Sequence, residues 1–427
     1  MKNFTWPLMQ NAITFSDKLK LATFVLTSDK FTNGPKVKEF EKAWSDWIGA
    51  KYSLYVSSGS TANSLLIASL KEFYGLEDGD KVLVPACTWI TSVAPIFQNN
   101  LRPIFCDVSL EDYCLNLDDL EDIKRNHPDI KMVFTTHLLG FHSNITKIKE
   151  LFPDAIVAED CCESHGVKDE NGNYCGSNTT GATFSFYYGH HLATVEGGII
   201  STNNKDLYTL MRIKRSHGLA READPETYEK YKKQYPDIIP TFLFVTDGYN
   251  FRNTELGAVL GLEQIKRLSK IIQIRNNNYK EYYSIISNRE DLFHVPSCKL
   301  DQMSSFALPF VCKDKKIYNL LMSEFEKNGI EYRPLVAGNL LRQPCLSKFK
   351  FGHKKTKYNA DIVHEFGLYV GNNHMVNHKN VTRSYKIKNR IDIPSENQIV
   401  VENTHEALVD ASTFKIAGKM VKVKKKR

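Results

Sequence analysis

Short apolar runs alternate with amphipathic stretches through the first half of this chain, and no other feature limits its fold as strongly. Each run has the length and composition of a strand buried on both faces of a sheet. The stretches between them, such as residues 61–73 and 117–125, are typical of helices. This alternation predicts an α/β fold with a large, mostly parallel sheet. The apolar runs lie at residues 81–85, 104–108, 132–135 and 155–160.

Polar residues stand at the ends of three of these runs. They are Asp107, Asp160 and the segment Thr135-Thr136-His137. The carboxyl ends of parallel strands meet at one edge of a sheet, and ligands of α/β proteins bind beyond that edge. We therefore expect these residues to point towards a ligand.

The second half of the chain predicts a smaller unit. A long, strongly polar helix is expected from about residue 262, followed by a strand at 305–311 and a helix at 317–327. The segment 221–241 lacks a clear period and is expected to be an exposed insertion, whereas residues 389–394 could add a short strand. We divide the chain into a large domain, a smaller C-terminal α/β domain and a flexible basic tail, at residues 1–261, 262–400 and 401–427.

The net charge of +7 comes from the end of the chain. The last seventeen residues, 411–427, contain seven Lys or Arg and no acidic residue, which leaves 49 basic against 49 acidic residues elsewhere. A charge-balanced body argues against a nucleic-acid partner. For the tail, we favour a solvated end over a contact with nucleic acid or a membrane surface.

The composition and the cysteines also indicate the cellular compartment of the protein. No stretch approaches the roughly 20 apolar residues of a membrane span, and the first residues lack the pattern of a secretory signal. Several of the nine cysteines lie inside apolar runs, as reduced cysteines of cytosolic proteins do. No C-x-C or C-x-x-C pair supports a zinc or redox motif. We expect a cytoplasmic protein with no metal site and no membrane partner.

Small residues open the helix that is expected at 61–73. The segment Ser58-Gly59-Ser60 presents backbone N–H groups and hydroxyls at a loop-to-helix junction, where the helix dipole adds positive potential. Such a junction can bind a phosphate group. Serine is also a common helix cap, so this segment alone leaves phosphate binding and simple capping equally open.

Two further residues could serve a flat, nitrogen-containing ring. Asp160 ends an apolar run, where its carboxylate could pair with a pyridinium nitrogen and make the ring an electron sink. Trp89 stands near the end of another run, where it could stack on the ring. A capping aspartate and a core tryptophan are the ordinary alternatives for each residue taken singly.

A histidine occupies a notable place after a Ser-Phe pair. Ser185-Phe186 is followed by three spacers, then by His190, and shortly afterwards by Glu196-Gly197-Gly198. An imidazole can move protons near neutral pH, but it cannot form the covalent link that a lysine amine forms with an aldehyde cofactor. The residue at position 190 therefore decides which reaction is possible.

In their order and spacing, these segments resemble the DegT/DnrJ/EryC1/StrS sugar aminotransferase family. The resemblance covers about residues 31–374 and includes Asp247-Gly248-Tyr249-Asn250-Phe251-Arg252. In that family the residue five after the serine is the lysine that holds pyridoxal 5′-phosphate, and here it is His190. With that exchange, the chain is most similar to the branch of GDP-4-keto-6-deoxy-D-mannose 3-dehydratases of the colitose pathway. The resemblance implies the fold type I, aspartate aminotransferase-like architecture.

The resemblance also implies contacts to the cofactor. Trp89 would stack on its ring, Asp160 would bind the pyridine nitrogen, and Glu163 would lie near the ring hydroxyl, where family members often have Gln. The large domain, residues 1–261, would thus be the cofactor-binding one. Four small residues would hold the cofactor phosphate, namely Ser58, Gly59, Ser60 and Ser185.

Four more positions are implied to serve the substrate or the neighbouring subunit. Asn250 and Arg252 would reach the phosphate or substrate of a second copy, which implies a homodimer with shared active sites. His217 would line the site. Arg333 would face the substrate or the carboxylate of the amino donor.

A histidine in the lysine position implies a change of reaction. The working cofactor would be pyridoxamine 5′-phosphate, held without a covalent bond, and L-glutamate would regenerate it. His190 would remove a proton and then assist the departure of the hydroxyl at C3 of a nucleotide 4-keto-6-deoxy sugar. This reaction belongs to 3,6-dideoxysugar biosynthesis for surface polysaccharide.

Three alternatives stay open at this point. A nucleotide-sugar 4-aminotransferase would need a lysine at or beside position 190, and none lies between Lys168 and Lys205. An iron–sulfur dehydratase would need clustered cysteines with a C-x-C pair, which the chain lacks. A non-catalytic binding protein of the same fold would have no need to retain Asp160 and the phosphate loop.

Overall fold

The large sheet has seven strands, and six of them run in one direction. A computed structural model describes residues 6–297, 299–347 and 358–374. In space the strand order is β1-β7-β6-β5-β4-β2-β3, and β7 alone is antiparallel to its neighbours in this sheet. The predicted, mostly parallel sheet is confirmed. The strands are β1 (Tyr52–Val56), β2 (Lys81–Pro85), β3 (Arg102–Cys106), β4 (Ile130–Thr136), β5 (Ile156–Asp160), β6 (Gly181–Ser185) and β7 (Gly198–Thr202).

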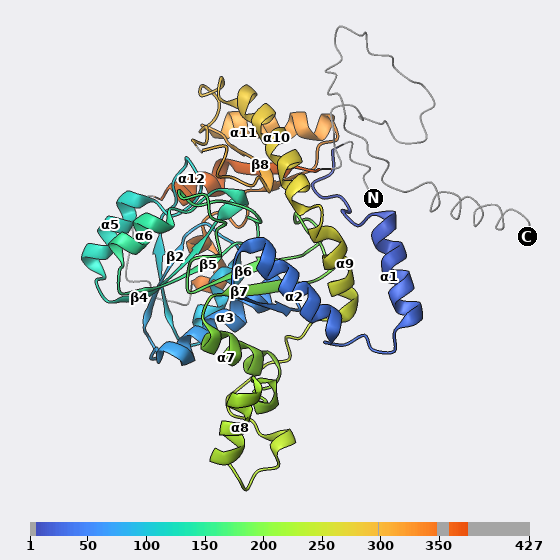
Figure 1. The fold of residues 1–427 in the computed structure, drawn as a ribbon. Helices are drawn as coiled ribbons and strands as arrows, with labels where there is room; N and C mark the ends of the chain where they lie inside the picture. The colour runs from blue at the N-terminus through green and yellow to red at the C-terminus, as the bar shows by residue number, and fades with distance from the viewer. Residues whose placement is uncertain (1–5, 298, 348–357, 375–427) are drawn as a thin grey trace, which may run out of the picture. The chain divides into compact units, whose positions relative to one another are not determined.

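Helices cover both faces of this sheet (Figure 1). Along β2, Val82 and Val84 enter one apolar cluster and Leu83 enters another, because successive side chains of a strand point to opposite faces. The first cluster includes residues of α3 and α7. Two clusters on the opposite face include residues of α2 and α9, and of α5 and α6. The helices are α2 (Pro35–Ile48), α3 (Gly59–Tyr74), α4 (Ala94–Gln98), α5 (Leu117–Asn126), α6 (Ile145–Leu151), α7 (Lys205–Arg215) and α9 (Glu255–Ile265).

A second, smaller sheet follows in the chain. Its three antiparallel strands have the order β8-β10-β9. The helix expected from residue 262 is in fact two helices, since α9 ends at Ile265 and α10 begins at Leu268. The domain division at 262 stays a prediction, and the tail and residues 389–394 lie outside the described residues. The elements are α10 (Leu268–Ile286), β8 (Ala307–Val311), α11 (Lys315–Lys327), β9 (Tyr332–Pro334), α12 (Asn359–Phe366) and β10 (Gly367–Gly371).

Two helices lie outside these layers. Helix α1 (Phe15–Thr27) packs against α9. Helix α8 (Pro225–Gln234) forms within the predicted insertion 221–241 and buries none of its residues (Figure 1). Asp224 caps α8, and charge pairs such as Lys230–Glu226 support it, so local interactions form a helix that has no buried face.

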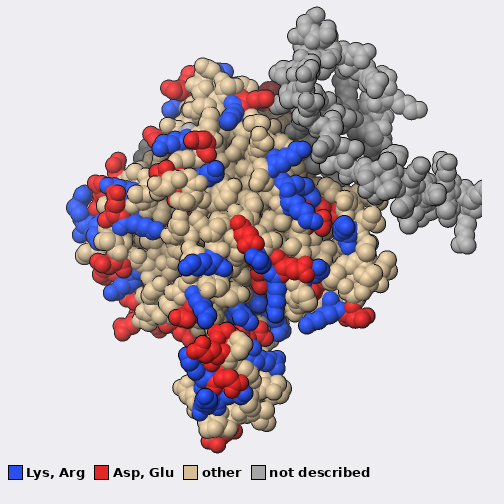
Figure 2. All heavy atoms as spheres, in the orientation of Figure 1, with Lys and Arg blue, Asp and Glu red and all other residues tan. Residues whose placement is uncertain are grey.

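Charges of both signs are interspersed on the face shown in Figure 2, around α8 as well as over the body. This pattern agrees with the balance of basic and acidic residues outside the tail. Among the helices of the described residues, none has both the length and the apolar composition that crossing a bilayer requires.

Candidate active site

A cavity of about 510 Å³ lies at the carboxyl edge of the large sheet. Its wall includes residues at or just after the ends of β1, β4, β5 and β6, as is usual for ligand sites of α/β proteins. Nine of the twelve predicted site residues line it, although they come from distant parts of the chain. These are Ser58, Gly59, Ser60, Trp89, Asp160, Glu163, Ser185, His190 and Arg333.

Asp107 was predicted to point towards a ligand, but in the structure it does not line the cavity. Its carboxylate accepts hydrogen bonds from the backbone N–H groups of Asn359 (2.8 Å) and Ala360 (3.0 Å) at the start of α12. Asp107 therefore ties α12 to the end of β3 and does not line the cavity. At the end of β4, Thr136 lines the cavity, whereas His137, the next residue, belongs to a separate buried network.

The Ser58-Gly59-Ser60 segment forms the first turn of α3. Ser58 caps the helix, and its hydroxyl accepts a hydrogen bond from Thr61 N–H at 3.1 Å, so the capping role is real. A Cβ atom on Gly59 would lie 2.6 Å from Cβ of Ser185, so only glycine lets the two loops meet. Unpaired N–H groups, helix dipole and hydroxyls thus converge on one wall of the cavity, which is the donor set that a phosphate needs.

Asp160 is held rigidly at the end of β5. Its Oδ2 atom accepts hydrogen bonds from Nδ2 of Asn63 (2.9 Å) and Oγ of Ser92 (2.7 Å), and Oδ1 accepts one from Cys162 N–H (3.0 Å). These three donors fix the orientation of a buried carboxylate that still lines the cavity. A carboxylate in this position can pair with a protonated ring nitrogen.

Glu163 lies beside Asp160 on the cavity wall. Burial raises its pKa to about 7, the nearby charge of Asp160 adds to this rise, and a hydrogen bond from Leu139 N–H (2.9 Å) opposes it. Near neutral pH the carboxyl group is therefore protonated in a large fraction of molecules. In that form it can donate a hydrogen bond, as a glutamine amide does.

Trp89 leaves 56% of its surface exposed although it lines the cavity. It is thus not a core residue, which was the ordinary alternative. A large aromatic face that is open to a cavity can stack on a flat ring.

His190 lies in the loop between β6 and β7. Its backbone N–H donates to the backbone carbonyl of Tyr187 (3.0 Å), and its ring packs against Phe306 with a centroid separation of 5.1 Å. Burial and the charge of Arg275 lower its pKa to about 3, so the ring is neutral at physiological pH. None of the described residues that line the cavity is a lysine, and the described lining includes the imidazole of His190.

Three predicted residues do not line the cavity but lie together nearby. Nε of Arg252 donates to Oδ1 of Asn250 (3.1 Å), and an Nη atom of Arg252 lies 3.3 Å from Nε2 of His217. Arg252 also pairs with Val56 in an antiparallel bridge at the end of β1. The cluster is therefore close to the Ser58-Gly59-Ser60 segment that follows β1, and its three residues do not line the cavity.

Several cavity residues carried no signal in the sequence. Arg275 stands in the middle of a polar helix, and Phe306 stands in an ordinary strand-like run. Leu8, Met9 and Gln10 come from the N-terminal segment, which is far from every motif. Contacts of this kind depend on tertiary packing, so no local pattern could have identified them.

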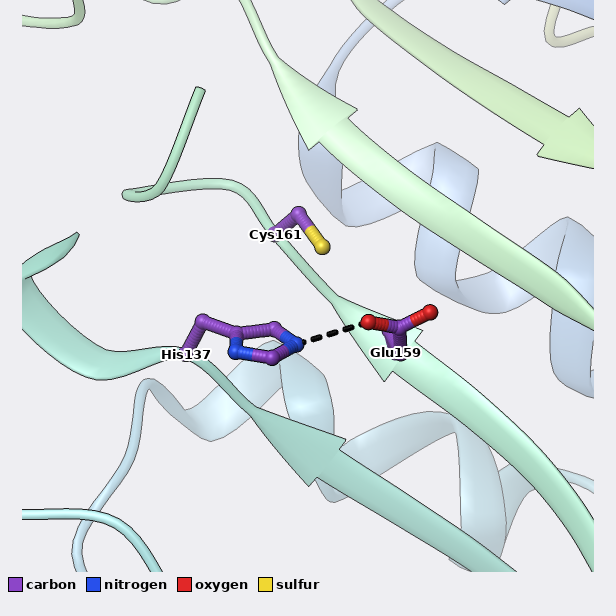
Figure 3. A group of neighbouring side chains, drawn as sticks. All are labelled: His137, Glu159 and Cys161. Carbon is purple, nitrogen blue, oxygen red and sulfur yellow. Dashed lines mark hydrogen bonds and ion pairs between the residues drawn. The ribbon is translucent and has the colours of Figure 1, made fainter. Parts of the chain in front are cut away.

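The group His137, Glu159 and Cys161 could hold a metal by proximity alone (Figure 3). However, Nδ1 of His137 accepts from Ser143 N–H (3.0 Å), and Nε2 lies 2.8 Å from Oε2 of Glu159. The second oxygen of Glu159 accepts from Gly176 N–H and from the hydroxyl of Thr179. Although burial opposes ionisation, the hydrogen bonds from His137 keep the pKa of Glu159 below its usual value. The imidazole has no nitrogen left for a metal, so this group is a network that joins β4 to β5.

Comparisons with known proteins agree with this site. Residues 14–387 match the DegT/DnrJ/EryC1/StrS aminotransferase family. GDP-4-keto-6-deoxy-D-mannose 3-dehydratase of Escherichia coli O55:H7 is 34% identical over 82% of this chain and 90% of that protein, and the Yersinia pseudotuberculosis enzyme of the same name is 32% identical over 86% and 93%. The solved structure of the E. coli enzyme with bound hydrated PLP has a TM-score of 0.78 and 30% identity, and the match covers 87% of this chain and 96% of that chain.

Proposed function

Since this chain belongs to the DegT/DnrJ/EryC1/StrS aminotransferase family, we propose that it is a 3-dehydratase of a nucleotide 4-keto-6-deoxy sugar. The nucleotide is GDP, as in the names of the two bacterial relatives. The enzyme removes the hydroxyl at C3 and depends on pyridoxal or pyridoxamine 5′-phosphate held without a covalent bond. L-glutamate restores the amine form, and the product serves 3,6-dideoxysugar biosynthesis for surface polysaccharide.

One observation carries this proposal. A histidine, His190, occupies the place of the family's lysine, while the residues suited to the cofactor remain around the cavity. The aminotransferase alternative needs a lysine amine in reach of the cofactor, and the described part of the cavity wall offers none. A non-catalytic protein would not need the triple hydrogen bonding that orients Asp160.

The cavity wall fits the cofactor residue by residue. The first turn of α3, with Ser58, Gly59 and Ser60, and the hydroxyl of Ser185 would hold its phosphate. Trp89 would pack on its ring. When bound, the cofactor supplies an electron sink for the loss of a proton and of a neighbouring hydroxyl.

Two carboxyl groups would orient the ring. The Asp160 carboxylate would keep the ring nitrogen protonated, because its own position is fixed by three donors. Glu163, with a pKa of about 7, would donate to or accept from the ring hydroxyl. In this way Asp160 and Glu163 would determine where electrons collect on the cofactor ring.

His190 would act first as a base and then as an acid. A neutral imidazole accepts one proton next to the reacting carbon. The same proton then goes to the departing hydroxyl at sugar C3, which leaves as water. The low pKa of His190 favours this second transfer, because the protonated ring gives up its proton readily.

The remaining positions would serve the substrate and a second subunit. Asn250, Arg252 and His217 form one cluster beside the phosphate loop, which suits a homodimer in which each copy completes the site of the other. Arg333 would face the substrate or the donor carboxylate, although an ion pair with Glu331 at 3.0 Å partly neutralises it. All eight cysteines that the structure describes are free thiols, which suits the cytoplasm.

The test uses the purified protein with pyridoxamine 5′-phosphate, glutamate and GDP-4-keto-6-deoxy-D-mannose. We expect mass spectrometry to show a sugar product that has lost the C3 oxygen, together with release of ammonia. Sugars carried by UDP, CDP or dTDP serve as controls for the nucleotide. A 4-amino sugar that retains the C3 oxygen would contradict the proposal and favour the aminotransferase.

A second test concerns the link between protein and cofactor. Borohydride treatment of the loaded protein should leave its intact mass unchanged, because no lysine is linked to the cofactor. The visible absorption of the cofactor should disappear on dialysis. A mass increase equal to a reduced cofactor adduct would show a covalent lysine link and reject the histidine assignment.

A further inference from the structure

Arg275 of α10 is a buried cation without a carboxylate partner. Only 4% of the residue is exposed, and Nε is buried with no hydrogen-bond partner. Its two Nη atoms donate to carbonyl oxygens, to Phe306 (3.0 Å) and, over longer distances, to Gly189 (3.4 Å) and His190 (3.5 Å). Within the described residues, it forms no ion pair.

Burying an unpaired charge is costly, because three carbonyl dipoles replace only part of the lost hydration. Burial lowers the pKa of Arg275 to about 10, and no neighbouring carboxylate raises it again. The guanidinium therefore keeps its charge at neutral pH. A cost of this kind at the wall of an active-site cavity favours a functional role over a purely structural one.

Four histidines surround this charge. The ring of His165 lies 6.2 Å from that of His190 and 5.4 Å from that of His191, between centroids. Within the described residues, Nδ1 of His191 and Nδ1 of His374 are buried without hydrogen-bond partners. Burial lowers the pKa of all four imidazoles, and the charge of Arg275 lowers each further.

The titratable groups that face His190 come from three places. Tyr187 and His191 belong to its own loop, His165 follows β5, and Arg275 comes from α10. In the described part of the chain, no carboxylate forms a hydrogen bond or ion pair with His190. Among the described charged groups, Arg275 is the one that shifts the pKa of this ring, while Asp160, Glu163 and Glu196 line the same cavity without a hydrogen bond or ion pair to His190.

We propose that Arg275 is a positioning residue that sets the acid–base behaviour of His190. One of its Nη atoms donates to the carbonyls of Gly189 and His190, the other donates to the carbonyl of Phe306, and its charge disfavours a protonated imidazole. The ring thus begins each turnover as a base, and once it has accepted a proton it returns that proton to the leaving hydroxyl. This role rests on the proposed function, in which His190 performs both transfers.

Three substitutions separate charge from geometry. Arg275→Gln keeps amide N–H donors but removes the charge, whereas Arg275→Lys keeps the charge but loses the fork that spans two carbonyls. Arg289→Met is the control, because Arg289 pairs with Asp291 on the surface. Circular dichroism and retention of the cofactor absorbance would show that each variant is folded.

The main readout is the titration of His190 itself. Hydrogen–deuterium exchange at the imidazole C2 position, followed by fragment mass spectrometry, gives a pKa for each histidine in the cofactor-loaded protein. We expect half-titration of His190 below pH 5 in the wild type, a rise of roughly one unit or more in Arg275→Gln, and a smaller change in Arg275→Lys. In each variant the acid limb of the kcat/KM profile should move upward by the same amount as the His190 pKa, and therefore further in Arg275→Gln than in Arg275→Lys.

Two results would overturn the inference. One is a His190 pKa near the ordinary 6.5 in the wild type, which needs no variant and so holds even if Arg275→Gln does not fold. The other is an equal loss of activity in both Arg275 variants with no shift in the titration, which would indicate a structural role alone. If the shift occurs but the wild type leaves the C3 oxygen in place, the proposed function fails and the electrostatic role of Arg275 stands.

Discussion

The raised pKa of Glu163 predicts how the free energy of unfolding changes with pH. The pKa of this carboxyl group is about 7 in the folded protein, against the ordinary value of 4.5 in the unfolded chain. Between these two pH values, the folded state keeps a proton that the unfolded state has released. The free energy of unfolding therefore falls as the pH rises through this window. A difference of about 2.5 units corresponds to roughly 3 kcal/mol at most, at about 1.36 kcal/mol per unit.

Glu163→Gln removes the ionisable group and keeps an oxygen that can accept from Leu139 N–H. Well below pH 4.5, the variant and the wild type should have similar stability, since both side chains are then neutral in the folded and the unfolded state. At pH 8 the variant should be more stable, by a value up to about 3 kcal/mol and smaller where water in the cavity screens the charge. Urea unfolding of the cofactor-free protein at a series of pH values measures this difference.

Glu196→Gln is the matched control, because Glu196 also lines the cavity but is exposed. Its unfolding free energy, measured at the same pH values, provides the reference for an exposed carboxyl group of the same cavity. If the difference between Glu163→Gln and the wild type were the same at pH 5 and at pH 8, the raised pKa of Glu163 would be refuted. The donor role that depends on it would then be lost as well.

Three further experiments test other parts of the site. Gly59→Ala places a Cβ 2.6 Å from Cβ of Ser185, so the phosphate loop must shift. The affinity for pyridoxal 5′-phosphate, measured by equilibrium dialysis, should therefore fall at least about tenfold. Unchanged affinity would contradict the placement of the phosphate. Asp160→Asn should lower kcat, measured under cofactor saturation, by about 10²- to 10³-fold, since one preorganised electrostatic contact is removed. A kcat near that of the wild type would exclude Asp160 as the partner of the cofactor ring. The inactive variants His190→Asn and Arg252→Ala, when unfolded and refolded together, should recover about a quarter of wild-type activity. In the proposed homodimer, half of the dimers would be mixed, and each mixed dimer would have one intact site. No recovery would argue against shared sites.

Much of the large sheet could be predicted because its strands are buried on both faces. Such strands appear as continuous apolar runs, and β2, β4 and β5 lie where these runs predicted them. Strand β3 begins and ends two residues before the predicted range, since Asp107 leaves the sheet to bind the start of α12. Helix α8 escaped prediction because its stability comes from a cap and local charge pairs, which produce no apolar period.

The site was predictable only where a function imposes a local motif. The Ser-Gly-Ser turn, the Ser-Phe loop with His190, and Asp160 at the end of an apolar run each combine residue type with a recognisable position. Arg275 has no such signature, because its importance comes from the loop that its guanidinium contacts across the fold. Similarly, the association of His217 with Arg252 depends on a chain reversal that joins residues 35 positions apart.

The central claim is that His190 replaces a covalent tether with a proton-transfer group. A single-turnover experiment tests it most directly, with pyridoxamine 5′-phosphate bound to the wild type and to His190→Asn, GDP-4-keto-6-deoxy-D-mannose added, and the sugar mass followed over time. We predict that the wild type removes the C3 oxygen, whereas His190→Asn binds the cofactor equally well and leaves the sugar intact. Loss of the C3 oxygen at a comparable rate in His190→Asn would contradict the account.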